Sequence, residues 1–140
     1  MILLDTNIAS VLMTPDHPDL ATVEAWQRAS SDRDIRLSAI TLAEVAYGVA
    51  ILPEGSTKAQ ISRAAKDFFT ATADTVLPFG IREAEAYGQI MADRRAQGHP
   101  MSPLDAQIAA IAHVAGAVVA TRNTRDFTGC GVPLVSPYAQ

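Results

Sequence analysis

Four acidic residues stand where the sequence predicts that a strand ends or a helix begins: Asp5, Glu44, Asp105 and Asp126. Asp5 directly follows residues 2–4, an apolar run with the pattern of a short buried strand. An ionised carboxylate at the end of a buried strand is costly unless it is paired or bound to a cation. Mg²⁺ and Mn²⁺ prefer oxygen ligands of this kind. The acids therefore suggest a metal centre, with Asp5 as the strongest candidate ligand.

The other three acids also have a simpler explanation. Each lies three residues after a residue that can cap a helix: Glu44 after Thr41, Asp105 after Ser102, and Asp126 after Asn123. An acid in the first helical turn is stabilised by free N–H groups and by the helix dipole. Capping therefore accounts for each of these acids taken alone. It is also compatible with metal binding, because the same helix ends keep the acids ionised.

The elements that must position these acids alternate along the chain. Strands are predicted at residues 2–4, 35–38, 75–79, 117–120 and 132–135, and helices at 20–29, 41–52, 58–73, 82–97 and 103–115, with a short turn or helix at 123–127. Residues expected on the buried helix faces include Leu42, Val45, Ile61, Phe69, Leu104 and Ile108. This alternation predicts an α/β fold, a three-layer α/β/α sandwich with a parallel sheet. Residues 1–140 are expected to form one domain.

The predicted topology brings the acids to one edge. In an open parallel sheet, ligands bind beyond the carboxyl ends of the strands. Asp5 follows the first strand, Glu44 the second, and Asp126 the strand at 117–120. Asp105 reaches the same edge only if the loop at residues 98–103 allows it. Carboxylates so crowded repel one another unless a cation binds them.

The acids lie in four short motifs: Leu4-Asp5-Thr6-Asn7, then Ser38-Ala39-Ile40-Thr41-Leu42-Ala43-Glu44 with Gly48, then Asp105-Ala106-Gln107-Ile108-Ala109-Ala110, and last Thr121-Arg122-Asn123 with Asp126-Phe127. Taken in order, these motifs resemble those of PIN-domain ribonucleases. More narrowly, the sequence resembles the VapC-type toxins of bacterial toxin–antitoxin pairs, including the FitB-like subgroup. Each motif is short, but the four in series cover nearly the whole chain.

The resemblance implies Mg²⁺- or Mn²⁺-dependent cleavage of RNA by a homodimer that a small DNA-binding antitoxin neutralises. It also implies that Asp5 and Asp105 are the principal metal ligands and that Glu44 completes the catalytic site. The fourth position departs from the family pattern. Many relatives carry an acid where Asn123 stands, and others where Asp126 stands. We expect Asp126 to be the fourth catalytic acid, with Asn123 orienting a water or binding phosphate.

Basic residues near the acids are candidates for holding RNA. Arg122 and Arg125 bracket Asn123, and we expect Arg122 to bind substrate, with Arg94 and Arg95 as weaker candidates. The net charge of −4, from 15 acids and 11 Lys and Arg residues, argues mildly against a nucleic-acid partner. If four acids form one metal site, however, the remaining 11 acids balance the 11 basic residues. Composition is therefore neutral on this question.

Two other classes of function deserve comparison. A receiver domain or phosphohydrolase needs a lysine late in the chain, but the only lysines are Lys58 and Lys66. A haloacid-dehalogenase-like enzyme needs an acid at position 7, where Asn7 stands. A catalytically weak PIN-like protein that only binds RNA or a partner is the other alternative, and Asn123 is its one indication.

The compartment follows from cysteine usage and hydropathy. The lone Cys130 excludes an internal disulfide and favours a reducing compartment. The longest uncharged stretch, residues 106–121, is too short and too polar to span a membrane. We therefore expect a cytoplasmic protein that has no membrane partner.

Overall fold

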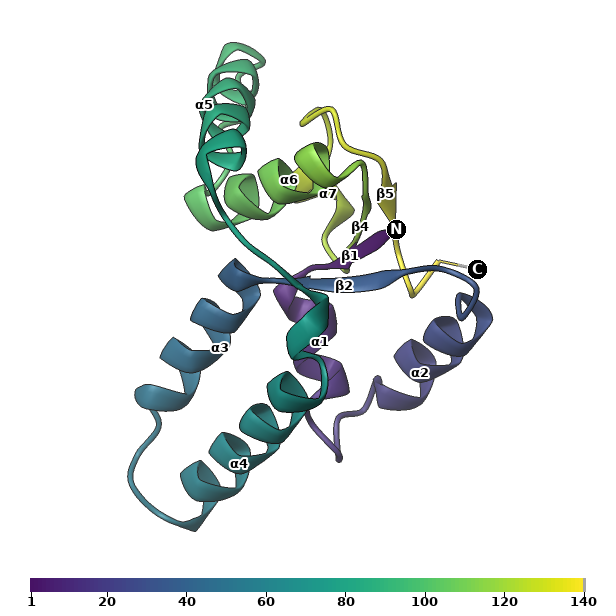
Figure 1. Cartoon of the computed structure of the whole chain (residues 1–140), viewed down its shortest axis with the longest axis vertical. Helices are drawn as coiled ribbons and strands as arrows, with labels where there is room; N and C mark the ends of the chain where they lie inside the picture. Colours follow the sequence, from purple (N-terminus) through teal and green to yellow (C-terminus); the bar gives the residue numbers. More distant parts are fainter. Residues whose placement is uncertain (140) are drawn as a thin grey trace.

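The computed structural model describes residues 1–139 and contains a five-stranded parallel sheet in the order β3-β2-β1-β4-β5 (Figure 1). The strands are β1 (Ile2–Leu4), β2 (Ile35–Ser38), β3 (Val76–Leu77), β4 (Val118–Ala120) and β5 (Leu134–Val135). In the central strand β1, Ile2 pairs with Ile35 of β2 on one side and with Val118 of β4 on the other. All strands therefore end at the same edge.

The helices cover both faces of this sheet. They are α1 (Thr6–Leu12), α2 (Leu20–Ala29), α3 (Ala39–Ala50), α4 (Ser56–Ala71), α5 (Ile81–Ala96), α6 (Pro103–Ala115) and α7 (Thr124–Phe127), with a 3₁₀ turn at Ala73–Thr75. Helices α5 and α6 lie on one side of the sheet in Figure 1, and α1, α2 and α4 on the other. The predicted α/β/α sandwich with a parallel sheet is confirmed.

Alternation along β1 divides the apolar core into two clusters. Successive strand side chains point to opposite faces of a sheet. Leu3 accordingly packs with α5, α6 and β4, whereas Ile2 and Leu4 pack with α1, α2 and β2. Because both faces of β1 are buried, the residue that follows it lies between the two layers, and that residue is Asp5.

Helix α6 has the predicted ends. The Ser102 hydroxyl accepts a hydrogen bond from the Asp105 N–H at 3.2 Å, and Pro103 is the first helical residue. Gly116 ends the helix with φ +66°, a left-handed conformation that favours glycine. Asp105 therefore lies in the first turn of α6, as predicted.

The predicted start of α3 is wrong. The helix begins at Ala39, and its cap is Ser38, whose hydroxyl accepts from the Thr41 N–H at 3.1 Å. Thr41 is fully buried inside the first turn. Glu44 consequently lies in the second turn, so the capping explanation does not apply to it.

Three residues predicted to be buried are exposed: Leu42 (41%), Ile61 (44%) and Leu104 (45%). Leu42 lines an open groove between α3 and α4, and Ile61 lines a second groove bounded by α1, α3 and α4. Within residues 1–139, no other element covers these two positions. Leu104 lies in the first turn of α6, where Ala106 and Ile108 form the buried face. Strand β3 is also shorter than the predicted residues 75–79, since the 3₁₀ turn takes Thr75 and Pro78 has no N–H to extend the pairing. In the described part of the chain, no helix is both long and apolar enough to cross a membrane.

The packing of α6 predicts a large stability difference between two of its apolar residues. Ile108→Ala should lower the free energy of unfolding by about 2–5 kcal/mol, because Ile108 is fully buried between the sheet and α5. Leu104→Ala, on the same helix, should change it by only about 0.5 kcal/mol. Urea unfolding measures both values, and equal losses would contradict this placement of α6.

Candidate metal centre

Asp5 is a buried carboxylate that ends the central strand and caps α1. Its side chain is 5% exposed. One oxygen accepts from the Thr6 N–H at 2.8 Å, and the other accepts from the Thr121 hydroxyl at 2.8 Å. Thr121 follows β4, which pairs with β1, so the neighbouring strand supplies the second bond. Two bonds from neutral donors hold this carboxylate but do not neutralise its charge.

Thr6 connects Asp5 to Glu44. The Thr6 hydroxyl donates to a Glu44 oxygen at 2.8 Å and lies 3.0 Å from the Thr41 hydroxyl. One residue therefore binds Asp5 through its main chain and Glu44 through its side chain. This contact explains how Glu44 reaches the edge of the sheet from the second turn of α3.

Asp105 and Asp126 continue the group of acids. The charges of Asp105 and Glu44 both raise the pKa of Asp5, and the charge of Asp126 raises the pKa of Asp105. Each effect requires the two carboxylates to be near enough to repel each other. The four acids therefore form a series from Glu44 through Asp5 and Asp105 to Asp126.

Burial is the main cause of the raised pKa values of Asp5 and Asp105. It raises the pKa of Asp5 to about 6, against the hydrogen bonds from Thr121 and Thr6 and together with the neighbouring charges. Burial also raises the pKa of the half-buried Asp105, while the Ser102 side chain and the Arg94 charge oppose the rise. A bound cation would offset the desolvation that both carboxylates suffer.

The chemistry of these donors suits a hard divalent cation with few protein ligands. Within residues 1–139, no three His, Cys, Asp or Glu side chains are placed so that they could enclose an ion. Mg²⁺ does not require such a cage, because it usually binds one or two carboxylates, several waters and substrate phosphates. Asp5 and Asp105, which are close enough to interact, fit that pattern.

At the fourth position, Asn123 precedes α7 and Asp126 lies on it. Asn123 is the residue before this one-turn helix, but its side chain makes no capping bond. Its main-chain N–H donates to the Thr121 hydroxyl at 3.0 Å, so the same hydroxyl contacts both Asn123 and Asp5. Asp126 is in the first turn of α7, as predicted, and is the acid next to Asp105.

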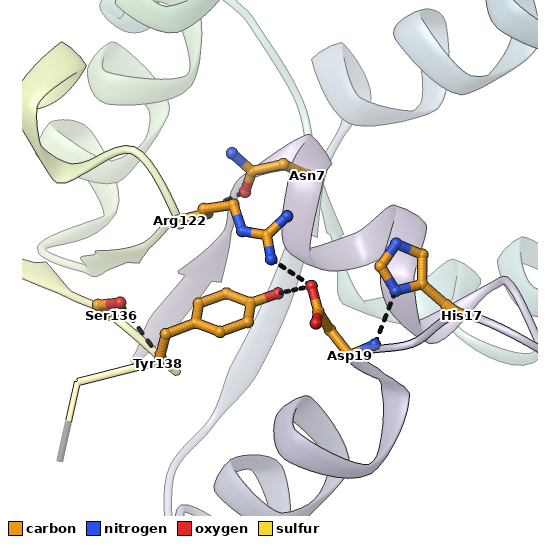
Figure 2. Close-up of polar contacts among 6 residues, drawn as sticks. All are labelled: Asn7, His17, Asp19, Arg122, Ser136 and Tyr138. Carbon is orange, nitrogen blue, oxygen red and sulfur yellow. Dashed lines mark hydrogen bonds and ion pairs between the residues drawn. The ribbon is translucent and has the colours of Figure 1, made fainter.

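Arg122 is held in a network of contacts at the edge of this site (Figure 2). Its guanidinium forms an ion pair with Asp19 and lies 4.5 Å above the centre of the Tyr138 ring. Its main-chain N–H donates to the Asn7 side chain at 3.3 Å. The side chain nevertheless remains 49% exposed, so part of the guanidinium faces solvent. The sequence did not predict the contacts with Asp19 and Tyr138, because both residues lie far from Arg122 along the chain.

Arg94, an expected candidate for holding RNA, is instead buried. Its guanidinium donates to the carbonyl oxygens of His99, Asp126 and Thr128 at 2.7, 3.0 and 2.6 Å. It therefore has no surface to offer to RNA, and this expectation is wrong. The sequence also did not identify the parts played by the Thr6 and Thr121 hydroxyls. Both lie inside the motifs, but only the pairing of β1 with β4 brings Thr121 to Asp5.

The raised pKa of Asp5 predicts a pH-dependent stability in metal-free protein. The folded chain keeps the Asp5 proton up to about pH 6, whereas the unfolded chain loses it near 3.8. The free energy of unfolding should therefore fall by about 3 kcal/mol as the pH rises through this window. Asp5→Asn should remove this fall and so be more stable than wild type at pH 8, because an amide carries no charge.

Urea unfolding in EDTA at pH 4 and pH 8 measures this effect. The Asn oxygen can still accept from Thr6, so the α1 cap is retained. Asp67→Asn, at an exposed position on α4, is the matched control and should leave the wild-type profile in place. An Asp5→Asn protein that is less stable than wild type at pH 8 would contradict the proposed cost of this charge.

Comparisons with known proteins agree with this fold. The PIN domain family model matches residues 2–128. The protein "VapC ribonuclease Y4jK" of Sinorhizobium fredii is 36% identical over 139 residues, covering 99% of this chain and 98% of its own. "Toxin FitB" of Neisseria gonorrhoeae is 35% identical, covering 99% of each chain.

Solved structures give the same result. A chain of "Structure of FitAB bound to IR36 DNA fragment" superposes with a TM-score of 0.88 at 35% identity, covering 100% of this chain and 97% of that one. "Crystal Structure of FitAcB from Neisseria gonorrhoeae" gives the same score and identity and covers both chains completely. The matches extend over the four acid-bearing segments and the sheet that positions them, and the chain belongs to the PIN-domain family.

Proposed function

We propose that this chain is a Mg²⁺- or Mn²⁺-dependent endoribonuclease and the toxin of a type II toxin–antitoxin system. The observation that carries the proposal is the buried Asp5 carboxylate, which has two like-charged neighbours and no cationic partner among the residues described. Such a carboxylate is costly for the fold and useful for binding a cation. Relatives named as a VapC ribonuclease and as toxin FitB support the same activity.

In the proposed site, Asp5 and Asp105 are the metal ligands and Glu44 completes the catalytic group. A bound divalent cation supplies Lewis-acid polarisation of a phosphodiester and lowers the pKa of water. Thr6 and Thr121 keep the Asp5 oxygens in place. Since no histidine is part of the site, a carboxylate such as Glu44 or Asp126 would accept the proton of the attacking water.

We propose that Arg122 and Asn123 contact the RNA backbone. Arg122 lies next to Thr121, and half of its side chain is exposed beyond its contacts with Asp19 and Tyr138. The Asn123 amide makes no capping bond with α7 and is available to a phosphate or a water. Both residues border the acids, where a phosphate bound to the cation would lie.

The proposed partners are a small DNA-binding antitoxin and a second copy of this chain. An apolar groove of about 610 Å³ between α3 and α4, lined in part by Val45, Val49 and Phe69, is of the kind that accepts a helix. The FitAB relative is bound to a DNA fragment, which supports a DNA-binding partner. Exposed apolar residues on α3 and at the start of α5, including Tyr47 and Ile81, are candidates for a dimer contact. We propose that one domain, residues 1–140, acts in the cytoplasm.

The alternative is a catalytically weak PIN-like protein that binds RNA or a partner. The uncharged Asn123 is the feature that favours it. Retention of Asp5, Glu44 and Asp105 favours the nuclease.

The nuclease proposal predicts metal-dependent cleavage that needs Asp5. Purified antitoxin-free protein should cleave RNA with Mg²⁺ or Mn²⁺ and lose activity in EDTA. Asp5→Asn should reduce cleavage by roughly 100-fold or more, because the cation contributes several kcal/mol of transition-state stabilisation. Single-turnover cleavage of a labelled RNA measures the loss. Equal cleavage by both proteins, or none by a folded wild type, would refute the proposal.

The proposed role of Arg122 predicts a change in the salt dependence of RNA binding. In the Asp5→Asn background, which limits cleavage, log affinity should fall with log salt less steeply once Arg122 is replaced by Gln. The slope should become less negative by about 0.7, the value for one phosphate contact with a single strand. Fluorescence anisotropy with a labelled RNA gives this slope. Arg28→Gln, which also removes an ion-paired arginine but on α2, is the control. Identical slopes for all three proteins would exclude a phosphate contact by Arg122.

A further inference from the structure

Arg94 is a buried cation that the proposed mechanism does not use. Within residues 1–139, it and Asp5 are the only charged residues that are buried, and Arg94 is 5% exposed. None of the ion pairs in the described part of the chain includes it. A buried arginine without a carboxylate partner is costly, so its hydrogen bonds must compensate for the lost hydration.

Those bonds go to main-chain oxygens in two different segments. The Nε atom donates to the His99 oxygen at 2.7 Å, in the turn that leads from α5 into α6. The Nη1 atom donates to the oxygens of Asp126 and Thr128 at 3.0 and 2.6 Å, at the end of α7. Asp105 begins the helix after the first segment, and Asp126 lies in the second. The Arg94 guanidinium therefore hydrogen-bonds both segments that position Asp105 and Asp126.

Helix α7 needs this support because it is one turn long. An isolated turn is unstable, and the last carbonyl groups of any helix lack partners within the helix. At the start of α7, the Asn123 side chain makes no capping bond. At its end, Arg94 supplies donors and a positive charge, both of which suit a helix C-terminus. The Phe127 side chain is buried in the core, and Asp126 is exposed.

We propose that Arg94 is a positioning residue, whose guanidinium fixes the end of α7 so that the Asp126 carboxylate is held beside Asp105. The expected effect of Arg94 on metal binding rests on the proposed metal-dependent function. The fixing of α7 by Arg94 does not depend on that function. The Arg94 charge also acts on Asp105, whose pKa it lowers against the effect of burial and of Asp126. Arg94 thus offsets part of the repulsion between two carboxylates to which its guanidinium makes no hydrogen bond.

Hydrogen exchange in metal-free protein tests the geometry. Arg94→Lys keeps the charge but cannot donate to three carbonyl groups in fixed directions. It should increase exchange at the amides of Asp126 and Cys130, whose bonds belong to the α7 segment, while the amides of β1 and β4 stay protected. Arg95→Lys, at the exposed neighbouring position, should exchange like wild type. Unchanged protection of α7 in a folded Arg94→Lys protein would overturn the proposal.

A Mn²⁺ titration tests whether Arg94 affects metal binding, and it needs no RNA. The electron paramagnetic resonance signal of the free ion measures how much Mn²⁺ is bound. Arg94→Lys should weaken binding by roughly ten-fold or more, because Asp126 lies beside the proposed ligand Asp105, and residues that support a ligand or its bound waters without binding the metal have effects of this size. Asp126→Asn should weaken it too, and the double variant should bind no more weakly than Asp126→Asn alone, because both changes act through one carboxylate.

The outcomes separate the positioning role from the proposed function. Additive losses in the double variant, or wild-type affinity in Arg94→Lys, would overturn the positioning role. A wild type that binds no Mn²⁺ would contradict the proposed metal-dependent function, and hydrogen exchange would still decide whether Arg94 fixes α7.

Discussion

The desolvated charge of Asp5 is the constraint on which the rest of the site depends. Its carboxylate follows the central strand of a sheet that is covered on both faces, and it is buried from solvent. Among residues 1–139, the donors to its oxygens are the neutral Thr6 N–H and Thr121 hydroxyl. The fold thus keeps a charge where it is expensive, and this cost is the reason that a cation would bind there strongly.

The two threonines that donate to Asp5 also contact neighbouring elements of the site. Thr121 connects Asp5 to the exit of β4 and, through the Asn123 N–H, to the start of α7. Thr6 connects Asp5 to Glu44 on α3. One threonine at each of two positions therefore connects β4, α7 and α3 to one carboxylate. Arg94 serves the more distant acids in a similar way, from a helix that carries no ligand itself.

Local signals in the sequence predicted most of the fold. Residues 20–29 and 35–38 form the predicted helix and strand, and Ser102, Pro103 and Gly116 begin and end α6 as their chemistry requires. The start of α3 was missed because Ser38 and Thr41 are both plausible caps, and only burial of Thr41 decides between them. Ile61 was misplaced because helical periodicity cannot reveal whether another element covers the face.

The sequence predicted those parts of the candidate site whose positions follow from the ends of the strands. Parallel strands bring Asp5, Glu44 and Asp126 to one edge whatever their side chains contact. Arg94 and the Arg122–Asp19–Tyr138 network were not predictable, because their partners are main-chain oxygens or residues distant in sequence. Anomalous scattering from a crystal soaked in Mn²⁺ shows whether a cation binds at Asp5. We expect a peak about 2.1 Å from an Asp5 oxygen, on the side facing Asp105. An ordered crystal with no peak at Asp5 would contradict metal binding by this carboxylate.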